Sequence, residues 1–456
     1  MFTTFRYVLA AGFVLLAVSA TAQQPRLAPA DATADGLVAE ALQKTPDIIV
    51  ARAAVEAAQR RVVPARTLSD PSASISYQND GRSISLGKAE GSFIGLMLSQ
   101  PLSWPGKLAL AGRVAESEAR EIETGMLSRT SLAIEARVRN AWYALELAQA
   151  IDRLIDEKRD TARQIEATTR DRYAAGLAVQ QDVLRSQVEL ARIDELKAAQ
   201  RATISSVLAE LNRLAGRQQD ARLDVAADLP PLAPIPPASS VIASVLSRSP
   251  EAAAARQGIE TGRLRVEIAK KNFLPDFVVS GGSMDRGSFE MGPMWTAGVS
   301  VSLPIWVNRR QQNQLAEAQA RVTEQTAQTD VVGRELEART RERIAGLEAA
   351  NEVATLYSEK IVPLDQLSYE SALASYQSGK VPFITVFDAV NALYADRASY
   401  LGRLAEAAKW RVAIDEGSLQ AGAMSAAPSI TSPGMSTTAG TAPQGQSATK
   451  SMTSMR

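Results

Sequence analysis

The chain has 456 residues, of which 46% are apolar but only 5% aromatic, a balance that favours long packed helices over a compact enzyme. Lysine plus arginine equals aspartate plus glutamate at 50 each, so no bulk charge favours nucleic acid or an acidic partner. The absence of cysteine and histidine excludes disulfides, thiolate and imidazole metal ligands and the usual general base, and we expect no cofactor and no metal.

Residues 1–22 have the pattern of a cleaved secretory signal peptide. Arg6 precedes an apolar run from Val8 to Ala20, and Ala20-Thr21-Ala22 has the small-residue form of a cleavage site. After this segment no window of about 18 residues is apolar enough to cross a bilayer as a helix. We therefore expect that, if this exported chain enters a membrane, it does so as a closed β-barrel.

Residues 33–45 and 47–68 are predicted to be two helices, with Pro46 in the first turn of the second. A strand pair follows, because Ala73, Ile75 and Tyr77 alternate with serines and glutamine. The alternation leaves two alternatives open, which are a strand pair that crosses a bilayer and a soluble flap packed on the helices. The loop 79–91 is rich in Gly and Ser and suits a hairpin connection.

Residues 106–175 contain no proline and show apolar spacings of three and four, which predicts one helix of about 70 residues, on the order of 105 Å long. Tyr173-Ala-Ala-Gly176 is predicted to end it, because Gly readily adopts the left-handed conformation that reverses a chain. Ile204, Val207, Leu211 and Leu214 continue the pattern on a return helix.

A second copy of this arrangement follows a proline-rich connector. Nine positions from Ala39 to Val62 recur 204 residues later, from Ala243 to Val266, without a gap. The second copy has strands ending near Leu303, a loop at 284–292, a helix from Asn308 broken only at Pro363, and the turn Tyr376-Gln-Ser-Gly379. The predicted organisation is a signal at 1–22, a first repeat at 23–220, a connector at 221–238, a second repeat at 239–418 and a disordered tail at 419–456.

Two hairpins in one chain cannot close a sheet in lipid, so a membrane form requires oligomerisation. The acids Asp182 and Asp388 follow the two turns, and in a trimer Asp388 would form a ring of carboxylates that favours cations. Arg172 and Arg185 lie near the first turn and are candidates to bridge these acids and to hold the mouth of the channel closed, as a gate. The alternative for each acid is a simple interaction with a helix N-terminus.

The chain resembles the TolC-type outer-membrane efflux factors over about residues 33–418. The resemblance depends on the duplication, on the two turns, and on Ser99-Gln-Pro101-Leu-Ser-Trp-Pro-Gly-Lys107 and Ser302-Leu-Pro304-Ile-Trp306, where a strand becomes a long helix. The stretch around Trp104 is most similar to the heavy-metal-efflux branch.

The resemblance implies a mainly α fold with β structure, namely a long α-helical coiled-coil barrel continuous with a trimeric transmembrane β-barrel of four strands per chain, internally duplicated. It implies an outer-membrane location with a periplasmic extension, and as partners a homotrimer, outer-membrane lipid, a periplasmic adaptor and an inner-membrane pump. Tyr173, Gly176, Tyr376 and Gly379 would meet the adaptor. The family carries two acids at positions matching Thr385 and Asp388, so Thr385 is a departure from its pattern.

The sequence thus predicts a non-enzymatic outer-membrane exit duct of a tripartite efflux system. One alternative is a periplasmic coiled-coil adaptor or scaffold without a channel, which would not need two alternating strand pairs. Another is an exported hydrolase with a helical stalk, for which no nucleophile and base can be named. The exported substrate is open among metal ions, drugs and aromatic compounds.

Overall fold

The computed structural model describes residues 33–79, 82, 84, 91–223, 229–287 and 292–419. These residues belong to one compact unit, residues 1–421, and a second unit, residues 422–456, lies outside them. The predicted signal peptide, the predicted tail beyond Leu419 and most of the loop 79–91 also lie outside the described residues.

Three short helices begin the described chain, namely α1 (Ala34–Lys44), α2 (Pro46–Arg60) and α3 (Val62–Arg66). Pro46 lies in the first turn of α2, as predicted. The single helix predicted for 47–68 is instead divided at Arg61. The division follows from Pro64, which has no N–H to donate to the carbonyl of Arg60.

The two predicted strand pairs form one antiparallel sheet. Its strands are β1 (Ser72–Gln78), β2 (Phe93–Leu102), β3 (Asp276–Asp285) and β4 (Met294–Ser302), in the order β1-β2-β3-β4. The central pair, β2 with β3, joins segments from the two halves of the sequence. The loop predicted to begin at Met284 begins later, because Met284 pairs with Gly95 on one side and Met294 on the other.

The predicted first long helix is confirmed, and it contains a π-helical segment. α4 (Lys107–Ile122), η1 (Glu123–Ser128) and α5 (Arg129–Ala174) follow one another directly, and α6 (Gln180–Leu214) runs back along α5. The predicted stripe on α6 is buried where Leu211 and Leu214 pack with Val138 and Leu145 of α5.

In the second half, α7 (Ala238–Arg248) and α8 (Pro250–Lys271) precede the strands, and α9 (Gln311–Leu356), η2 (Tyr357–Ile361), α10 (Val362–Gln377) and α11 (Phe383–Glu416) follow them. The predicted long helix of the second half is confirmed as far as Gln377, but its predicted start at Asn308 and its predicted break at Pro363 are not. The helix starts at Gln311, and Pro363 lies in the first turn of α10, directly after the π-helical segment, where a missing N–H is tolerated.

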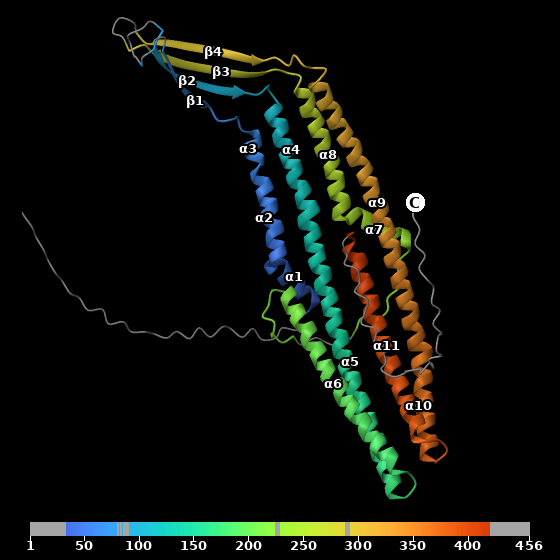
Figure 1. The fold of residues 1–456 in the computed structure, drawn as a ribbon. Helices are drawn as coiled ribbons and strands as arrows, with labels where there is room; N and C mark the ends of the chain where they lie inside the picture. Colours follow the sequence, from blue (N-terminus) through green and yellow to red (C-terminus); the bar gives the residue numbers. More distant parts are fainter. Residues whose placement is uncertain are drawn as a thin grey trace, which may run out of the picture. The chain divides into compact units, whose positions relative to one another are not determined.

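The helices pack side by side in the same order as the strands (Figure 1). Next to the sheet, α2 and α3 contact α4, α4 contacts α8, and α8 contacts α9. Farther along, α6 contacts α5, α5 contacts α11, and α11 contacts α10. Each row therefore runs from a first-half element at one end to a second-half element at the other. Among the described helices, none combines the length and hydropathy needed to cross a membrane.

Candidate functional site: the two faces of the sheet and the paired turns

The sheet has one apolar face and one face of small polar residues. The register places residues of neighbouring strands on a common face, so that Ile75 lies beside Leu96, and Val279 lies beside Val299. The apolar face carries Ala73, Ile75, Tyr77, Ile94, Leu96, Leu98, Leu102, Phe277, Val279, Trp295, Ala297, Val299 and Val301, together with Gln100, Gly281, Ser283 and Asp285. The opposite face carries Ser72, Ser74, Ser76, Gln78, Gly95, Ser99, Pro101, Asp276, Ser280, Gly282, Thr296, Gly298, Ser300 and Ser302, together with the larger apolar residues Phe93, Met97, Val278, Met284 and Met294.

The apolar face is not covered within the chain. Ile75 is 79% exposed and Trp295 is 80% exposed, and neither value is usual for a large apolar side chain of a monomer that is stable in water. No other described element of this chain buries this face, so the structure does not contain the alternative arrangement, in which the strands form a flap packed on the helices. A sheet of this kind suits an apolar medium on one side and water on the other.

Both edges of the sheet are unpaired within the described residues. β1 pairs only with β2, and β4 pairs only with β3, so the outer backbone N–H and C=O groups of β1 and β4 lack strand partners. Open edges of this length favour pairing with another strand. The helices at the two ends of the second row also have uncovered apolar surface. Exposed apolar residues lie on α6, at Leu184, Val188 and Leu196, and on α10, at Leu364 and Leu367.

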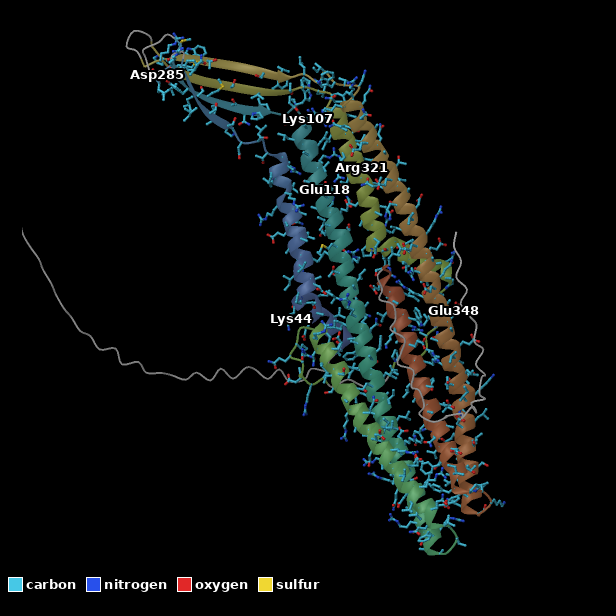
Figure 2. The ribbon with its side chains drawn as sticks, in the orientation of Figure 1. Lys44, Lys107, Glu118, Asp285, Arg321 and Glu348 are labelled. Carbon is cyan, nitrogen blue, oxygen red and sulfur yellow. The ribbon has the colours of Figure 1, made fainter. Side chains whose placement is uncertain are left out.

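The junction between the sheet and α4 is held by Lys107 and Asp276. The Lys107 ammonium donates to both carboxylate oxygens of Asp276 at 2.9 Å and to the carbonyl of Leu274 at 3.2 Å. The backbone N–H of Trp104 donates to Asp276 at 2.7 Å, and the Trp104 ring stacks on Phe277. Figure 2 shows Lys107 at the start of α4, next to the strands. The segment Trp104-Pro-Gly-Lys107 therefore connects the first half of the chain to the second half.

Gly106 makes this junction possible, because its φ of 89° lies in the left-handed region that favours glycine. The sequence pattern identified the segment from Trp104 to Lys107 but not its partner Asp276, because Asp276 lies 169 residues from Lys107 along the chain.

Lys107→Met is expected to lower the free energy of unfolding by about 1–3 kcal/mol, because it leaves the Asp276 carboxylate and the Leu274 carbonyl without their donor. The Lys107 side chain is 13% exposed but that of Asp276 is 45% exposed, so water compensates part of the loss. Denaturant unfolding of the purified protein measures the change. Lys270→Met is the control, because its exposed pair with Glu267 lies within a single helix. An equal change in both variants would contradict the structural role of Lys107.

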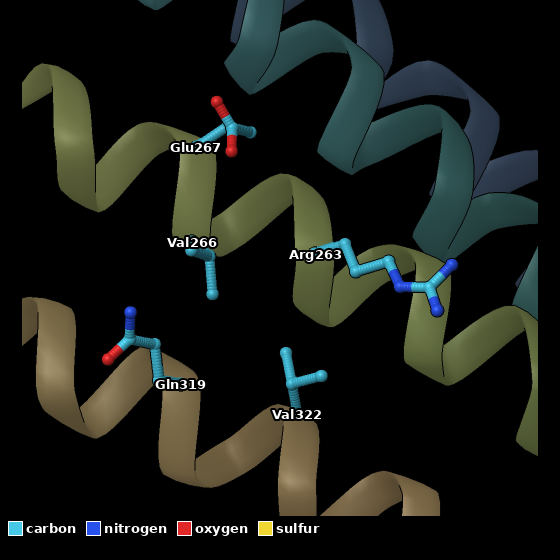
Figure 3. Close-up of a pocket in the computed structure, with 5 residues that line it drawn as sticks. All are labelled: Arg263, Val266, Glu267, Gln319 and Val322. Carbon is cyan, nitrogen blue, oxygen red and sulfur yellow. The ribbon is translucent and has the colours of Figure 1, made fainter.

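A pocket of about 230 Å³ lies between α8 and α9 (Figure 3). Val266 and Val322 point into it from the two helices, and Arg263, Glu267 and Gln319 complete its lining. The helices approach closely beside it, because a Cβ at Gly262 would overlap Gln325. This lining contains no nucleophile, and among the described residues no cluster of three acids has the arrangement of a metal site. The pocket therefore offers no catalytic constellation.

The two predicted turns are confirmed as left-handed helix ends. Gly176 has φ 73° and Gly379 has φ 75°. In the first turn Leu177 N–H donates to Arg172 O at 2.8 Å, and in the second Lys380 N–H donates to Ser375 O at 2.9 Å, which is the Schellman pattern in both. The turns reverse the chain from α5 to α6 and from α10 to α11.

Arg172 connects the two turns. Its Nη1 donates to the carbonyl of Gln377 and its Nη2 donates to the carbonyl of Leu177 at 3.3 Å. Its guanidinium also lies over the Tyr376 ring, 4.9 Å from the centroid. A single cation thus links one residue of each turn and the aromatic residue that precedes the second glycine.

The two tyrosines of the turns differ in environment. Tyr376 is 4% exposed, contacts Phe383 edge to face, and its hydroxyl donates to Thr169 Oγ1 at 3.5 Å. Tyr173 is 46% exposed. Of the two, only Tyr173 presents a ring to solvent in this chain, and Tyr376 belongs to the core that positions the turns.

The predicted acids and the predicted arginines are not paired with one another among the described residues. Asp182 is in the first turn of α6, where a carboxylate suits the helix N-terminus, and Thr385 and Asp388 are exposed on α11. Among the described residues, no ion pair joins Arg172 or Arg185 to Asp182 or Asp388. Arg172 is bound to carbonyls instead, a role for which the sequence carried no signal beyond its position near the turn.

The chain matches the family model described as "Outer membrane efflux protein" over residues 37–226 and 241–416. It is 24% identical over 395 residues to the cobalt-zinc-cadmium resistance protein CzcC of Cupriavidus metallidurans, covering 86% of this chain and 91% of that protein. The crystal structure of the outer membrane protein VceC from Vibrio cholerae superposes with a TM-score of 0.69 at 20% identity, covering 84% of this chain and 95% of that one. The Campylobacter jejuni CmeC outer membrane channel superposes with a TM-score of 0.62 at 16% identity, covering 84% and 85%.

Proposed function

Because the chain belongs to the outer membrane efflux protein family, we propose that it is the exit duct of a tripartite efflux system, through which substrates expelled by an inner-membrane pump leave the cell. The observation that carries this proposal is the four-stranded sheet, which has one apolar face, one small polar face and two unpaired edges. In the outer membrane the apolar face meets lipid and the polar face meets the water of the pore.

The working unit is a homotrimer. The β4 edge of one copy pairs with the β1 edge of the next, so that three sheets of four strands close without a free edge. The helix rows close in the same way, with the apolar stripe on α6 of one copy against that on α10 of the next. Within each chain, the order of elements in the two halves supports an internal duplication with repeats at 23–220 and 239–418.

The paired turns form the periplasmic end of the duct and bind the adaptor. Tyr173, Gly176 and Gly379 are exposed there, next to the apolar residues Leu177 and Val179. Tyr376 supports this surface from inside through Arg172. An adaptor with a helical hairpin suits such a surface of exposed apolar residues and helix ends.

Native mass measurement on the protein extracted from outer membranes tests the duct. A trimer that forms conducting pores in planar bilayers is the expected result. A soluble monomer or dimer without conductance would overturn the proposal and favour a periplasmic scaffold. From the similarity to the cobalt-zinc-cadmium resistance protein CzcC, the proposed cargo is a divalent metal ion. The sensitivity of a deletion strain to cobalt, zinc or cadmium tests the cargo separately.

Asp388→Asn is expected to lower the cation preference of the pore. Asp388 is exposed on α11, and three copies place three carboxylates around one axis, where they attract cations. The reversal potential across a planar bilayer under a salt gradient measures the preference. Asp388→Glu keeps the negative charge and is expected to retain the cation preference. An unchanged reversal potential in Asp388→Asn would show that Asp388 does not face the lumen.

A further inference from the structure

Two carboxyl groups meet between α10 and α11. Asp365 lies in the first turn of α10, and its side chain interacts by a hydrogen bond with that of Asp396 on α11. The Oδ2 atom of Asp365 is buried, and among the described residues it has no hydrogen-bond partner while both carboxyl groups are ionised. Two carboxylates in this arrangement repel when both are ionised, and one proton between them turns the repulsion into a hydrogen bond.

The arginine next to the pair is engaged with other groups. Arg397, the residue after Asp396, donates to Gln366 Oε1 at 3.1 Å and pairs with Glu157 Oε2 of α5 at 3.5 Å. It also lies over the ring of Tyr394. The elements packed on α11 carry these charged or titratable groups in the neighbouring turns: Glu157, Lys158 and Asp160 of α5, Glu352 of α9, Glu359 and Lys360 of η2, and Tyr369 and Glu370 of α10.

Burial, followed by the hydrogen bond and the charge of Asp365, raises the pKa of Asp396 from its ordinary 3.8 to about 6. A carboxyl group whose pKa is higher in the folded than in the unfolded chain favours the folded state while it is protonated. This stabilisation of the folded chain is fully present below pH 3.8 and is lost as the pH rises through about 6.

We propose that Asp365 and Asp396 share one proton that joins α10 to α11, and that loss of this proton in a more alkaline medium loosens the two helices above the second turn. The protonated carboxyl group of one residue donates to the carboxylate of the other, and after deprotonation two negative charges face each other. The π-helical segment η2 ends directly before α10 and provides the flexible point from which α10 moves, because π-helical turns interrupt the regular backbone ladder.

The proposal concerns contacts within one chain, so a failure of the native mass test would leave it intact. The chain contains no cysteine, and spin labels can therefore be placed at S368C on α10 and A395C on α11 without other labelling. We expect the distance distribution between the labels to lengthen or broaden between pH 5 and pH 8, with a midpoint at about 6.

Asp396→Asn is expected to abolish this step, because its amide donates to Asp365 at every pH. Asp415→Asn, which changes an exposed acid on the same helix, is the control and is expected to retain the step. A parent protein without the step, or a step that persists in Asp396→Asn, would overturn the proposal.

Infrared spectroscopy of the unmutated protein labelled with ¹³C-aspartate covers the case in which Asp396→Asn does not fold. The band of a protonated carboxyl group should disappear with a midpoint at about pH 6. Its disappearance near pH 4, with all aspartates titrating together, would equally overturn the proposal.

Discussion

Val299→Arg is expected to prevent the protein from forming a stable trimer in the outer membrane. Val299 lies in the middle of β4 on the apolar face and is 66% exposed in the chain. An arginine that faces lipid near the midplane of a bilayer costs about 2–4 kcal/mol, and three copies would impose this cost three times in one assembly. Fractionation of membranes followed by native mass measurement is the test.

Ser300→Arg is the matched control, because the adjacent residue on the same strand points to the opposite face. We expect trimers of Ser300→Arg to remain in the outer membrane and to show altered ion selectivity, since the new charge faces the pore. Loss of Ser300→Arg trimers together with normal assembly of Val299→Arg would reverse the assignment of the two faces.

Arg172→Ala is expected to raise the conductance of the closed pore. The variant removes the hydrogen bonds that join the two turns and the cation over the Tyr376 ring. Hydrogen bonds to a charged group contribute about 1.5–3 kcal/mol each, and every 1.4 kcal/mol changes an equilibrium by tenfold. The open fraction should therefore rise by at least about tenfold. Single-channel recordings in planar bilayers measure it.

Arg185→Ala provides the comparison for Arg172→Ala. Arg185 is exposed on α6, near the same turn, and carries the same charge. Its removal is expected to leave the open fraction unchanged. If both variants conducted equally, net charge near the turns rather than the link between them would control the opening.

Local features of the sequence predicted the fold well. The long helix through residues 107–174, the strand alternation and the left-handed glycines depend on neighbouring residues, and the structure contains all three. The errors also have local causes. Pro363 was expected to break a helix, but a proline in the first turn after a π-helical segment removes no needed hydrogen bond.

Contacts between residues distant in sequence were not predictable. Lys107 with Asp276, Arg172 with Gln377, and Asp365 with Asp396 join different helices or strands, and nothing in the flanking residues of either partner marks the other. The difference between Tyr173 and Tyr376 has the same origin. The two share one sequence motif, yet only Tyr376 lies beneath Arg172 and against Phe383.

The sequence by itself determined which segments are helices and strands, where the chain reverses, and that one side of each strand is apolar, because backbone conformation and alternation act over a few residues. Only the tertiary structure decided that the four strands form one sheet with open edges, that a single arginine links the turns, and that two acids face each other between α10 and α11. The first two features arise from packing between halves about 200 residues apart, and the third arises from the packing of α10 on α11 within the second half. In each case the environment of a side chain depends on its partner and not on the local pattern.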